Sequence, residues 1–558
     1  MRHALLVVSL VWIMGWAWSA EATQSNDMQR NDPRLNQGPK PIAEGNSAMV
    51  STQLPIVTET ALAVLERGGN AVDAMITATF LQHVVDYHQV SHFGTMSGIY
   101  YEADTGEYHV ISGVGARPLA GRCGEGDPSR VSIGGVVRAM GALADRWGTL
   151  EWSEYLQPAI QAATEGVEMS SFMYGINYNL MQTGDSGGLI DNPEARDFYM
   201  PDGFLVPVGE RWQMPALAAH LTALAEQGPD YMYEGEWAEK FVDAARAKGH
   251  CVAPEDLAEY EVQWQEPVRF SYNGHSMVGS APPDTGGAFV GLSLNMLQHF
   301  DLADRPHYSE SAETLEIMAR VFGRASEETR RMINDPLAMQ VPTDIWMSDA
   351  YGQMAADIVK ASMRQPGVSL SAPSDDGEEE AMTLGSDHNV IVDEQGNWFS
   401  VLHTGHGGAP GVLVDGVRAT GSTARAFTQG PGRRLVLPIT ALMIEKDGKP
   451  WLAMGTPGMP PQPVTQVLTN ILDWDMHPAE AASVPRFWAW LGNEPGIRIE
   501  SRISDEVRQG IRESGLPLSD LGPYYWSTGS MQIVWRDEET GRLYGVSDPR
   551  RLGWPAGY

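Results

Sequence analysis

The chain has 558 residues, of which 43% are hydrophobic and 20% charged, and its 71 acidic and 38 basic residues give a formal net charge of −33. This composition is that of a folded globular protein, and the length allows two or three average domains or one large layered sandwich. The negative charge argues against a nucleic acid or an anionic membrane as a partner, because both would repel the chain.

The N-terminus resembles a secretory signal peptide over residues 1–22. Arg2 is followed by an apolar run, and small residues stand at Ala20 and Ala22. This order predicts cleavage after Ala22. A membrane anchor is the alternative, although the run is short for a spanning helix. No later run approaches that length, so we expect a periplasmic or secreted protein that has no membrane partner after signal cleavage.

The next residues, 23–48, are polar and are expected to form a flexible lead-in. The chain has only two cysteines, Cys123 and Cys251. In an oxidising compartment they could pair, and the sequence leaves that bond open.

Residues 55–85 carry apolar side chains at helical spacing on both sides of a Gly-Gly-Asn break. Gly68 can end the first helix in a left-handed cap, and Asn70 can cap the second helix with Asp73 in its first turn. The stretch therefore predicts a helix-loop-helix.

Turn signals between stretches of alternating apolar and polar residues predict four hairpins, which turn at residues 104–106, 273–274, 395–397 and 447–448. Helical patterns stand between and after them, without strict alternation of strand and helix. This mixed order predicts an α+β layered sandwich with much antiparallel sheet. The acidic, Pro- and Ser-containing stretch 365–385 is the best candidate for a linker.

Several histidines are close in sequence or on expected neighbouring strands: His83, His88, His92, His388, His403 and His406. No HExxH or paired-cysteine pattern accompanies them. Core or loop histidines are commoner than metal ligands, so we expect no metal and no cofactor.

The linker ends in the sequence TLGSDHNVIV, where Ser386 opens an expected strand. A cut between Gly385 and Ser386 would give Ser386 a free α-amine with a pKa near ~8. Such an amine can act as the base for the hydroxyl of the same residue. The alternative is an ordinary turn serine in a chain that is never cut. No GxSxG elbow or Walker-type loop offers a different site.

Five segments are similar to motifs of one family: RGGNAVDA (67–74), EDLAEYEVQWQEP (255–267), APPDTGG (281–287), DHNVIVDEQGN (387–397) and LYGVSDPRRLGWPAGY (543–558). Together they make the chain resemble the gamma-glutamyltranspeptidase family of self-cleaving N-terminal nucleophile hydrolases. The resemblance implies a four-layer αββα sandwich made of a large subunit, 49–385, and a small subunit, 386–558.

The resemblance also implies roles for single residues. Ser386 stands where the family has the threonine of Thr-x-His, and Thr404 matches the second threonine that hydrogen-bonds the nucleophile. Gly458 and Met459 match the turn whose two N–H groups form the oxyanion hole.

Other positions depart from the family. Val114 replaces the arginine that grips the substrate carboxylate, and Leu437 stands in the shortened segment that lacks the paired serines. His406 replaces an asparagine, and Thr420 replaces the acidic residue that holds the substrate amine. Losing these charge-assisted bonds removes several kcal/mol of binding, so glutathione-like donors are expected to bind poorly.

These observations favour an exported, self-processing amidohydrolase that cleaves a small-molecule amide through an acyl-enzyme on Ser386, with an acyl group less charged than γ-glutamyl. One alternative is a true γ-glutamyl hydrolase or transpeptidase that grips its substrate through Arg117, Arg418 or Arg433. Another is an unprocessed, inactive binding protein. Asp387 poses a further question, because a carboxylate beside the new amine would favour its ammonium form and weaken the base, unless it points away.

Overall fold

The computed structural model describes residues 38–122, 130–182, 189–364, 385–420, 430–458, 461–490 and 496–558. The predicted signal peptide, most of the lead-in and of the linker, Cys123 and Met459 lie outside the described residues. Cys251 is buried and takes part in a disulfide. Within the described ranges, no helix combines the length and the apolar character needed to cross a membrane.

Two seven-stranded sheets form the centre of the molecule. Neighbouring strands of the first sheet are, in order, β21 (Trp554–Gly557), β2 (Met49–Thr52), β10 (Ser386–Val392), β11 (Trp398–Thr404), β3 (Thr95–Glu102), β4 (Glu107–Gly113) and β7 (Gln263–Gln265). Those of the second are β1 (Ala43–Gly45), β20 (Leu543–Ser547), β19 (Gln532–Arg536), β15 (Lys449–Gly455), β14 (Ala441–Lys446), β9 (His275–Gly279) and β8 (Val268–Tyr272). All the ladders within these two sheets are antiparallel.

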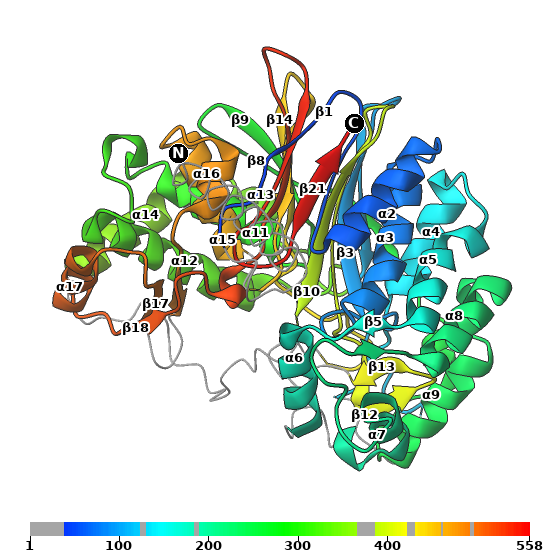
Figure 1. Cartoon of the computed structure of the whole chain (residues 1–558). Coiled ribbons are helices and arrows are strands. Elements are labelled where there is room, and N and C mark those ends of the chain that lie inside the picture. Colours follow the sequence, from blue (N-terminus) through cyan, green and yellow to red (C-terminus); the bar gives the residue numbers. More distant parts are fainter. Residues whose placement is uncertain are drawn as a thin grey trace, which may run out of the picture.

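Helices cover the outer face of each sheet (Figure 1). On the first sheet, α3 (Ala71–Val85) contacts β10 and β11, and α2 (Pro55–Glu66), α4 (Val136–Trp147) and α5 (Trp152–Glu165) pack around α3. On the second, α11 (Gly286–Leu297) contacts β8, β9 and β14, and α12 (Ala312–Met332), α14 (Asp349–Met363) and α15 (Pro461–Leu472) pack around α11.

The two sheets pack face to face through a separate apolar core. Val390 and Trp398 of the first sheet share one buried cluster with Met443, Ala453 and Val534 of the second. Alternate residues of these strands point into this core, as the period of two requires. The predicted α+β, four-layer αββα sandwich is therefore confirmed.

Outside the four layers lie two smaller groups of elements (Figure 1). One contains α6 (Ser171–Gln182), α7 (Pro193–Tyr199), α8 (Pro215–Gln227), α9 (Glu236–Ala247) and the hairpin of β12 (Gly408–Val414) and β13 (Val417–Thr420). The other contains α17 (Asp505–Glu513) and the sheet of β16 (Phe487–Trp490), β17 (Gly496–Glu500) and β18 (Leu518–Leu521).

The local signals around α2 and α3 act as predicted. Gly68 has a φ of +92° and follows the end of α2. Asn70 accepts hydrogen bonds from the backbone N–H groups of Val72 and Asp73, and Asp73 accepts one from Asn70 in return. This reciprocal capping box satisfies N–H groups that the helix leaves free.

All four predicted hairpins are present. The turn of each contains at least one residue of positive φ, and these residues include, in chain order, Gly106, Asn273, Gly396 and Asp447. The β12–β13 hairpin was not predicted. Its turn at Asp415-Gly416 also has positive φ at both residues, so the turn signal was there to be found.

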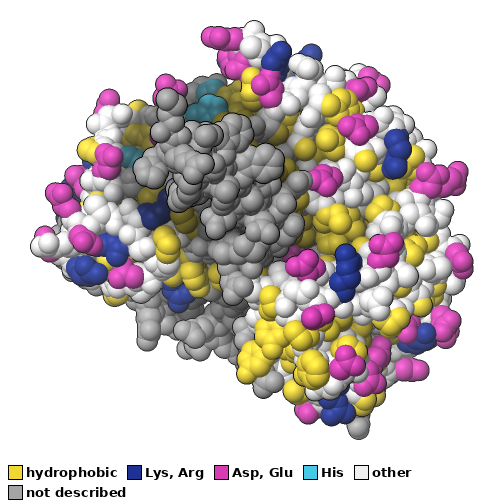
Figure 2. Space-filling model, in the orientation of Figure 1, with side chains coloured by type: hydrophobic (Ala, Val, Ile, Leu, Met, Phe, Trp, Pro, Cys, Tyr) yellow, Lys and Arg dark blue, Asp and Glu magenta, His cyan; other side chains and the backbone are white. Residues whose placement is uncertain are grey.

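Charged side chains are scattered over the face that Figure 2 shows, and acidic ones are spread widely across it. This distribution agrees with the net charge of −33.

Between α3 and the first sheet lies a group of buried histidines. The ring of His83 lies 4.6 Å from that of His92 and 5.1 Å from that of His403, and His220 of α8 lies 5.7 Å from His92. Burial lowers the pKa of His92 and of His403 to about 3, so both rings are neutral. No group of three or more His, Cys, Asp or Glu side chains suited to a metal ion occurs within the described part of the chain.

We expect these histidines to make the fold sensitive to acid. Their pKa in the folded chain lies below the unfolded value near ~6.5, so the unfolded chain binds more protons. The stability is then complete above a pH of about 6.5 and falls as the pH drops towards the folded values. In the described residues neither ring nitrogen of His83 has a hydrogen-bond partner, so His83→Phe removes a titrating group without breaking such a bond.

The His83→Phe chain should therefore lose stability less steeply in this range, by up to about 1.4 kcal/mol per pH unit. Urea unfolding at a series of pH values, on the Ser386→Ala background that we expect to remain one chain, measures both slopes. Equal slopes would contradict this account of the cluster.

Candidate active site

The site begins at the open end of the β10–β11 hairpin. Ser386 is the first residue of β10 and lies opposite Thr404, the last residue of β11. The Thr404 hydroxyl donates a hydrogen bond of 2.9 Å to the carbonyl oxygen of Gly385. The structure thus brings together the predicted cleavage site and the second threonine.

Alternating side chains of β10 face opposite layers. The ring of His388 contacts the Ser400 hydroxyl at 3.0 Å and lies against Gly455 of the second sheet. Asn389 instead exchanges hydrogen bonds of 2.9 and 2.7 Å with Gln82 of α3. Asp387 shares the face of Asn389, and its carboxyl lies beside that of Asp86 at the end of α3.

Asp387 is fully buried next to Ser386. Burial and the neighbouring Asp86 raise the pKa of Asp387 well above its usual range, although Arg551 acts in the opposite direction. Two adjacent buried carboxyls cannot both ionise readily, so Asp387 holds its proton. A neutral acid places no negative charge beside the Ser386 nitrogen, which removes the objection that the sequence raised.

The expected oxyanion turn follows β15. Gly458 has a φ of +89°, which favours glycine, and it packs against the carbonyl oxygen of Ser527. The Thr456 hydroxyl donates to the Pro457 carbonyl at 3.0 Å and accepts from the Ser530 N–H at 2.6 Å. The turn up to Gly458 is therefore fixed against residues 527–530, while Met459 lies outside the described residues.

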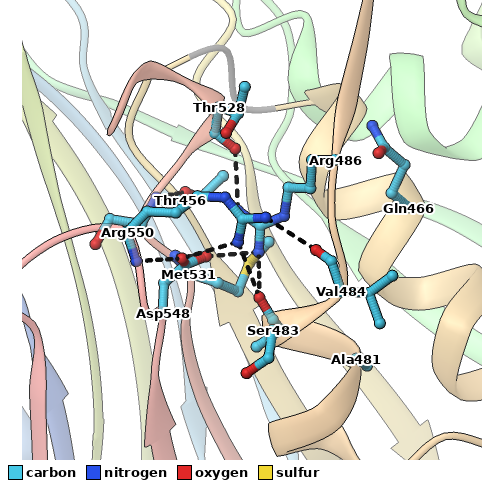
Figure 3. Close-up of polar contacts among 12 residues, drawn as sticks. Thr456, Gln466, Ala481, Ser483, Val484, Arg486, Thr528, Met531, Asp548 and Arg550 are labelled. Carbon is cyan, nitrogen blue, oxygen red and sulfur yellow. Dashed lines mark hydrogen bonds and ion pairs between the residues drawn. The ribbon is translucent and has the colours of Figure 1, made fainter. Parts of the chain in front are cut away.

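A buried ionic network contacts residues 527–530 through Arg486 (Figure 3). Arg486 forms an ion pair of 2.5 Å with Asp548 and donates to the Thr528 carbonyl at 3.0 Å. Arg550 contacts Asp548 at 3.1 Å and Glu500 at 2.6 Å. Burial opposes ionisation, but the two arginines hold the pKa of Asp548 below its usual range. The buried charges of the network are paired, although the Nε of Arg486 has no hydrogen-bond partner among the described residues.

Val114 and Leu437 lie in one small apolar cluster. Their buried side chains pack with Leu402, Leu435 and Ile439. Leu402 stands two residues before Thr404 on β11, so both side chains are on the same face of the strand. Val114, the predicted counterpart of the family's carboxylate-binding arginine, thus faces hydrocarbon.

The three arginines considered as substitutes lie in different surroundings. Arg117 is buried, and its guanidinium donates to the Val131 carbonyl at 2.8 Å. The backbone carbonyl of Arg433 accepts from the Arg117 N–H at 2.8 Å. Arg418 is fully buried, donates to the His88 and Val90 carbonyls, and lies against Gly405 directly after Thr404. Arg418 is therefore the one that reaches the Thr404 segment.

The two remaining predicted contacts lie beside Arg418. Burial, and to a smaller degree Arg418, lower the pKa of His406 to about 4. Thr420 ends β13 opposite Gly408, two residues after Arg418, and its side chain lies outside what the structure describes.

Sequence reasoning missed three residues near the Gly385–Ser386 bond. Gln89 and Arg551 contact Gly385 and Ser386, and Asp86 lies beside Asp387. Arg551 belongs to the C-terminal segment that carries the family likeness, but the sequence gives no sign that this segment reaches Ser386.

The fold and the site define a class of enzyme. Two antiparallel sheets lie between helical layers, and an inner strand begins with a hydroxyl residue that follows a glycine. This is the arrangement of the N-terminal nucleophile hydrolases. The chain belongs to the gamma-glutamyltranspeptidase family, because the family model of that description matches residues 57–558. It is therefore an amidohydrolase or acyltransferase of that type.

Individual relatives agree with this assignment. The chain is 27% identical to the glutathione hydrolase-like YwrD proenzyme of Bacillus subtilis, over 92% of this chain and 100% of the relative. It is 26% identical to the acylase ACY 1 proenzyme of Pseudomonas sp. strain SE83, over 85% and 88% of the two chains. The solved structure of the cephalosporin acylase from Bacillus halodurans superposes with a TM-score of 0.77 at 22% identity, covering 93% of this chain and 97% of that one.

Proposed function

We propose that the protein is an exported, self-processing amidohydrolase whose nucleophile is Ser386. The observation that carries this proposal is the hydrogen bond of 2.9 Å from the Thr404 hydroxyl to the carbonyl oxygen of Gly385. A donor on that oxygen stabilises the negative charge that develops there when the carbonyl carbon is attacked. The hydroxyl that would attack belongs to the very next residue.

In the self-cleavage step, the Ser386 Oγ forms a bond to the Gly385 carbonyl carbon and the C–N bond between the two residues breaks. The hydroxyl proton is transferred to the departing nitrogen, which becomes the α-amine. Water then hydrolyses the ester, which leaves a carboxylate on Gly385 and restores the Ser386 hydroxyl. The products are the predicted large and small subunits.

In turnover, the new α-amine takes the proton of the Ser386 hydroxyl as the hydroxyl attacks a substrate amide. The proton passes to the leaving amine, and the acyl group remains as an ester on Ser386 until water releases it. The Gly458 N–H belongs to the turn that would stabilise the oxyanion. Neither stage draws on a metal or a cofactor.

The surroundings favour an acyl group that is less charged than γ-glutamyl. Val114 and Leu437 offer only hydrocarbon where a carboxylate would be held. Arg418 is buried beside His406 and precedes Thr420 on the same strand, so it places a positive charge near the positions at which the family holds an ammonium group. A like charge there disfavours an α-amine.

A panel of acyl anilides tests this substrate class. We expect the processed enzyme to hydrolyse an aliphatic acyl anilide with a kcat/KM at least about 10²-fold above that for γ-glutamyl anilide, because two lost charge-assisted hydrogen bonds are worth ~3 kcal/mol or more. The released aniline gives both rates. A preference for the γ-glutamyl compound would overturn the assignment.

That reverse result would favour the second candidate, a γ-glutamyl hydrolase that binds its substrate through Arg418. The buried guanidinium of Arg418 has no ion pair within the described ranges, which is the observation in favour of this candidate. Arg418→Met would then raise KM for γ-glutamyl anilide, whereas Arg433→Met would serve as the matched control.

The proposed location rests on two points. The first residues are similar to a secretory signal. The disulfide at Cys251 fits an oxidising compartment such as the periplasm or the exterior.

A further inference from the structure

Two side chains that the proposed mechanism does not use lie next to the Gly385–Ser386 bond. Gln89 is 3% exposed, and its amide lies so close to Gly385 that a Cβ atom at residue 385 would have no room. Arg551 is 4% exposed, and its Nη1 donates to the Gln89 Oε1 at 3.2 Å and to the Ser386 carbonyl oxygen at 3.4 Å. The two side chains thus contact both residues of the bond and each other.

Contacts with Trp526 fix the orientation of the Arg551 side chain. Its Nε donates to the Trp526 carbonyl at 3.0 Å, and its guanidinium lies 5.1 Å from the centre of the Trp526 ring. The Trp526 ring has an edge contact of 5.3 Å with Phe172 of α6. A planar guanidinium held on one edge and stacked on a ring loses little further freedom when its other edge makes hydrogen bonds.

The charges around Arg551 also keep it in place. Burial lowers the pKa of Arg551 to about 10, and Asp387, Asp86 and Asp548 oppose that change, so the side chain is a cation at neutral pH. Among the groups that face the acid pair, His88 lies 3.1 Å from Asp86 and is neutral because burial lowers its pKa to about 4. Arg551 is therefore a buried cation beside this acid pair.

We propose that Arg551, acting through Gln89 and the Ser386 carbonyl, is a positioning residue that holds the Gly385–Ser386 bond for attack and then holds the new N-terminus. The inference rests on the proposed self-cleavage at Ser386. It explains how a serine at the very end of a strand is kept in place, where fraying would otherwise displace it. A displacement of about 1 Å can slow a reaction by ~10²-fold.

The test follows self-cleavage from synthesis onward in pulse-labelled protein, so it needs no knowledge of the substrate. Arg551→Ala should slow the appearance of the small subunit by about 10²-fold. Arg551→Lys, which keeps the charge and loses the planar fork, should be intermediate. Guanidinium ion added to the Arg551→Ala protein should speed cleavage, while methylammonium should do so less. A lost packing contact would not be restored in this way.

A matched control is Arg498→Ala, because Arg498 also lies over a tryptophan ring, 5.4 Å from the centre of Trp488, on β17. It should cleave at the wild-type rate. Gln89→Met is a second test of the proposal, and it leaves every charge in place. This variant should also cleave more slowly, while its thermal midpoint stays near that of the wild type.

The outcomes separate the two proposals. A wild-type chain that never cleaves would overturn the proposed function, and this inference with it. A wild-type chain that cleaves, together with Arg551→Ala or Gln89→Met at the wild-type rate, would overturn the inference alone. If Arg551→Ala does not fold, Gln89→Met and Arg551→Lys decide: slowed cleavage in both supports the inference, and the wild-type rate in either overturns it.

Discussion

Ser386→Ala is expected to remain a single chain and to show no turnover with any amide. The substitution removes the hydroxyl that we propose attacks the Gly385 carbonyl, and without the cut no α-amine forms at residue 386. Both stages of the proposed chemistry therefore stop together. Electrophoresis shows the uncut chain, and the acyl anilide assay shows the loss of turnover.

Ser386→Thr is the matched control, since threonine is the residue that the likeness to the family predicts at this position. It keeps the hydroxyl and limits its rotation, so cleavage should proceed at least as fast as in the wild type. A Ser386→Ala protein that still divides next to Gly385 would place the nucleophile elsewhere.

Thr404→Val should slow self-cleavage by about 10²- to 10³-fold, the usual effect of removing one oxyanion donor. Valine keeps the branched shape of threonine and removes only the hydroxyl that donates to the Gly385 carbonyl at 2.9 Å. The rate at which the small subunit appears in pulse-labelled protein measures the effect.

Thr404→Ser keeps the donor and should stay within a few-fold of the wild type. If Thr404→Val cleaves as fast as Thr404→Ser, the hydrogen bond to Gly385 is a packing feature and does not assist the reaction.

Much of the fold could be predicted because its signals are local. The capping box at Asn70 and the left-handed glycine at position 68 lie within a few residues of the helix ends that they define. The hairpin turn near Gly396 fixes the register of β10 and β11, which sets Thr404 opposite Ser386. The resemblance to the family had already singled out both residues. The site residues that belong to this one hairpin could therefore be predicted from the sequence.

The rest depends on contacts between distant parts of the chain. Arg551 reaches Ser386 across 165 positions and Gln89 across 462. The pairing of Asp86 with Asp387 likewise joins the end of α3 to the start of β10. No period or turn signal encodes such meetings, which arise only when the sheets assemble.

The question about Asp387 shows the same limit. The sequence left open whether its carboxylate weakens the neighbouring amine or points away from it. Its environment raises its pKa, because it is buried beside another acid, so it stays neutral. A charge assigned from residue type alone is unreliable at a buried position.

The measurement that tests the central claim most directly is the N-terminal sequence of the fragments of the purified wild-type protein. The account predicts two chains, the smaller of which begins with Ser-Asp-His-Asn, residues 386–389. A protein that remains one chain with Gly385 still joined to Ser386, or a small chain that begins at another residue, would contradict it.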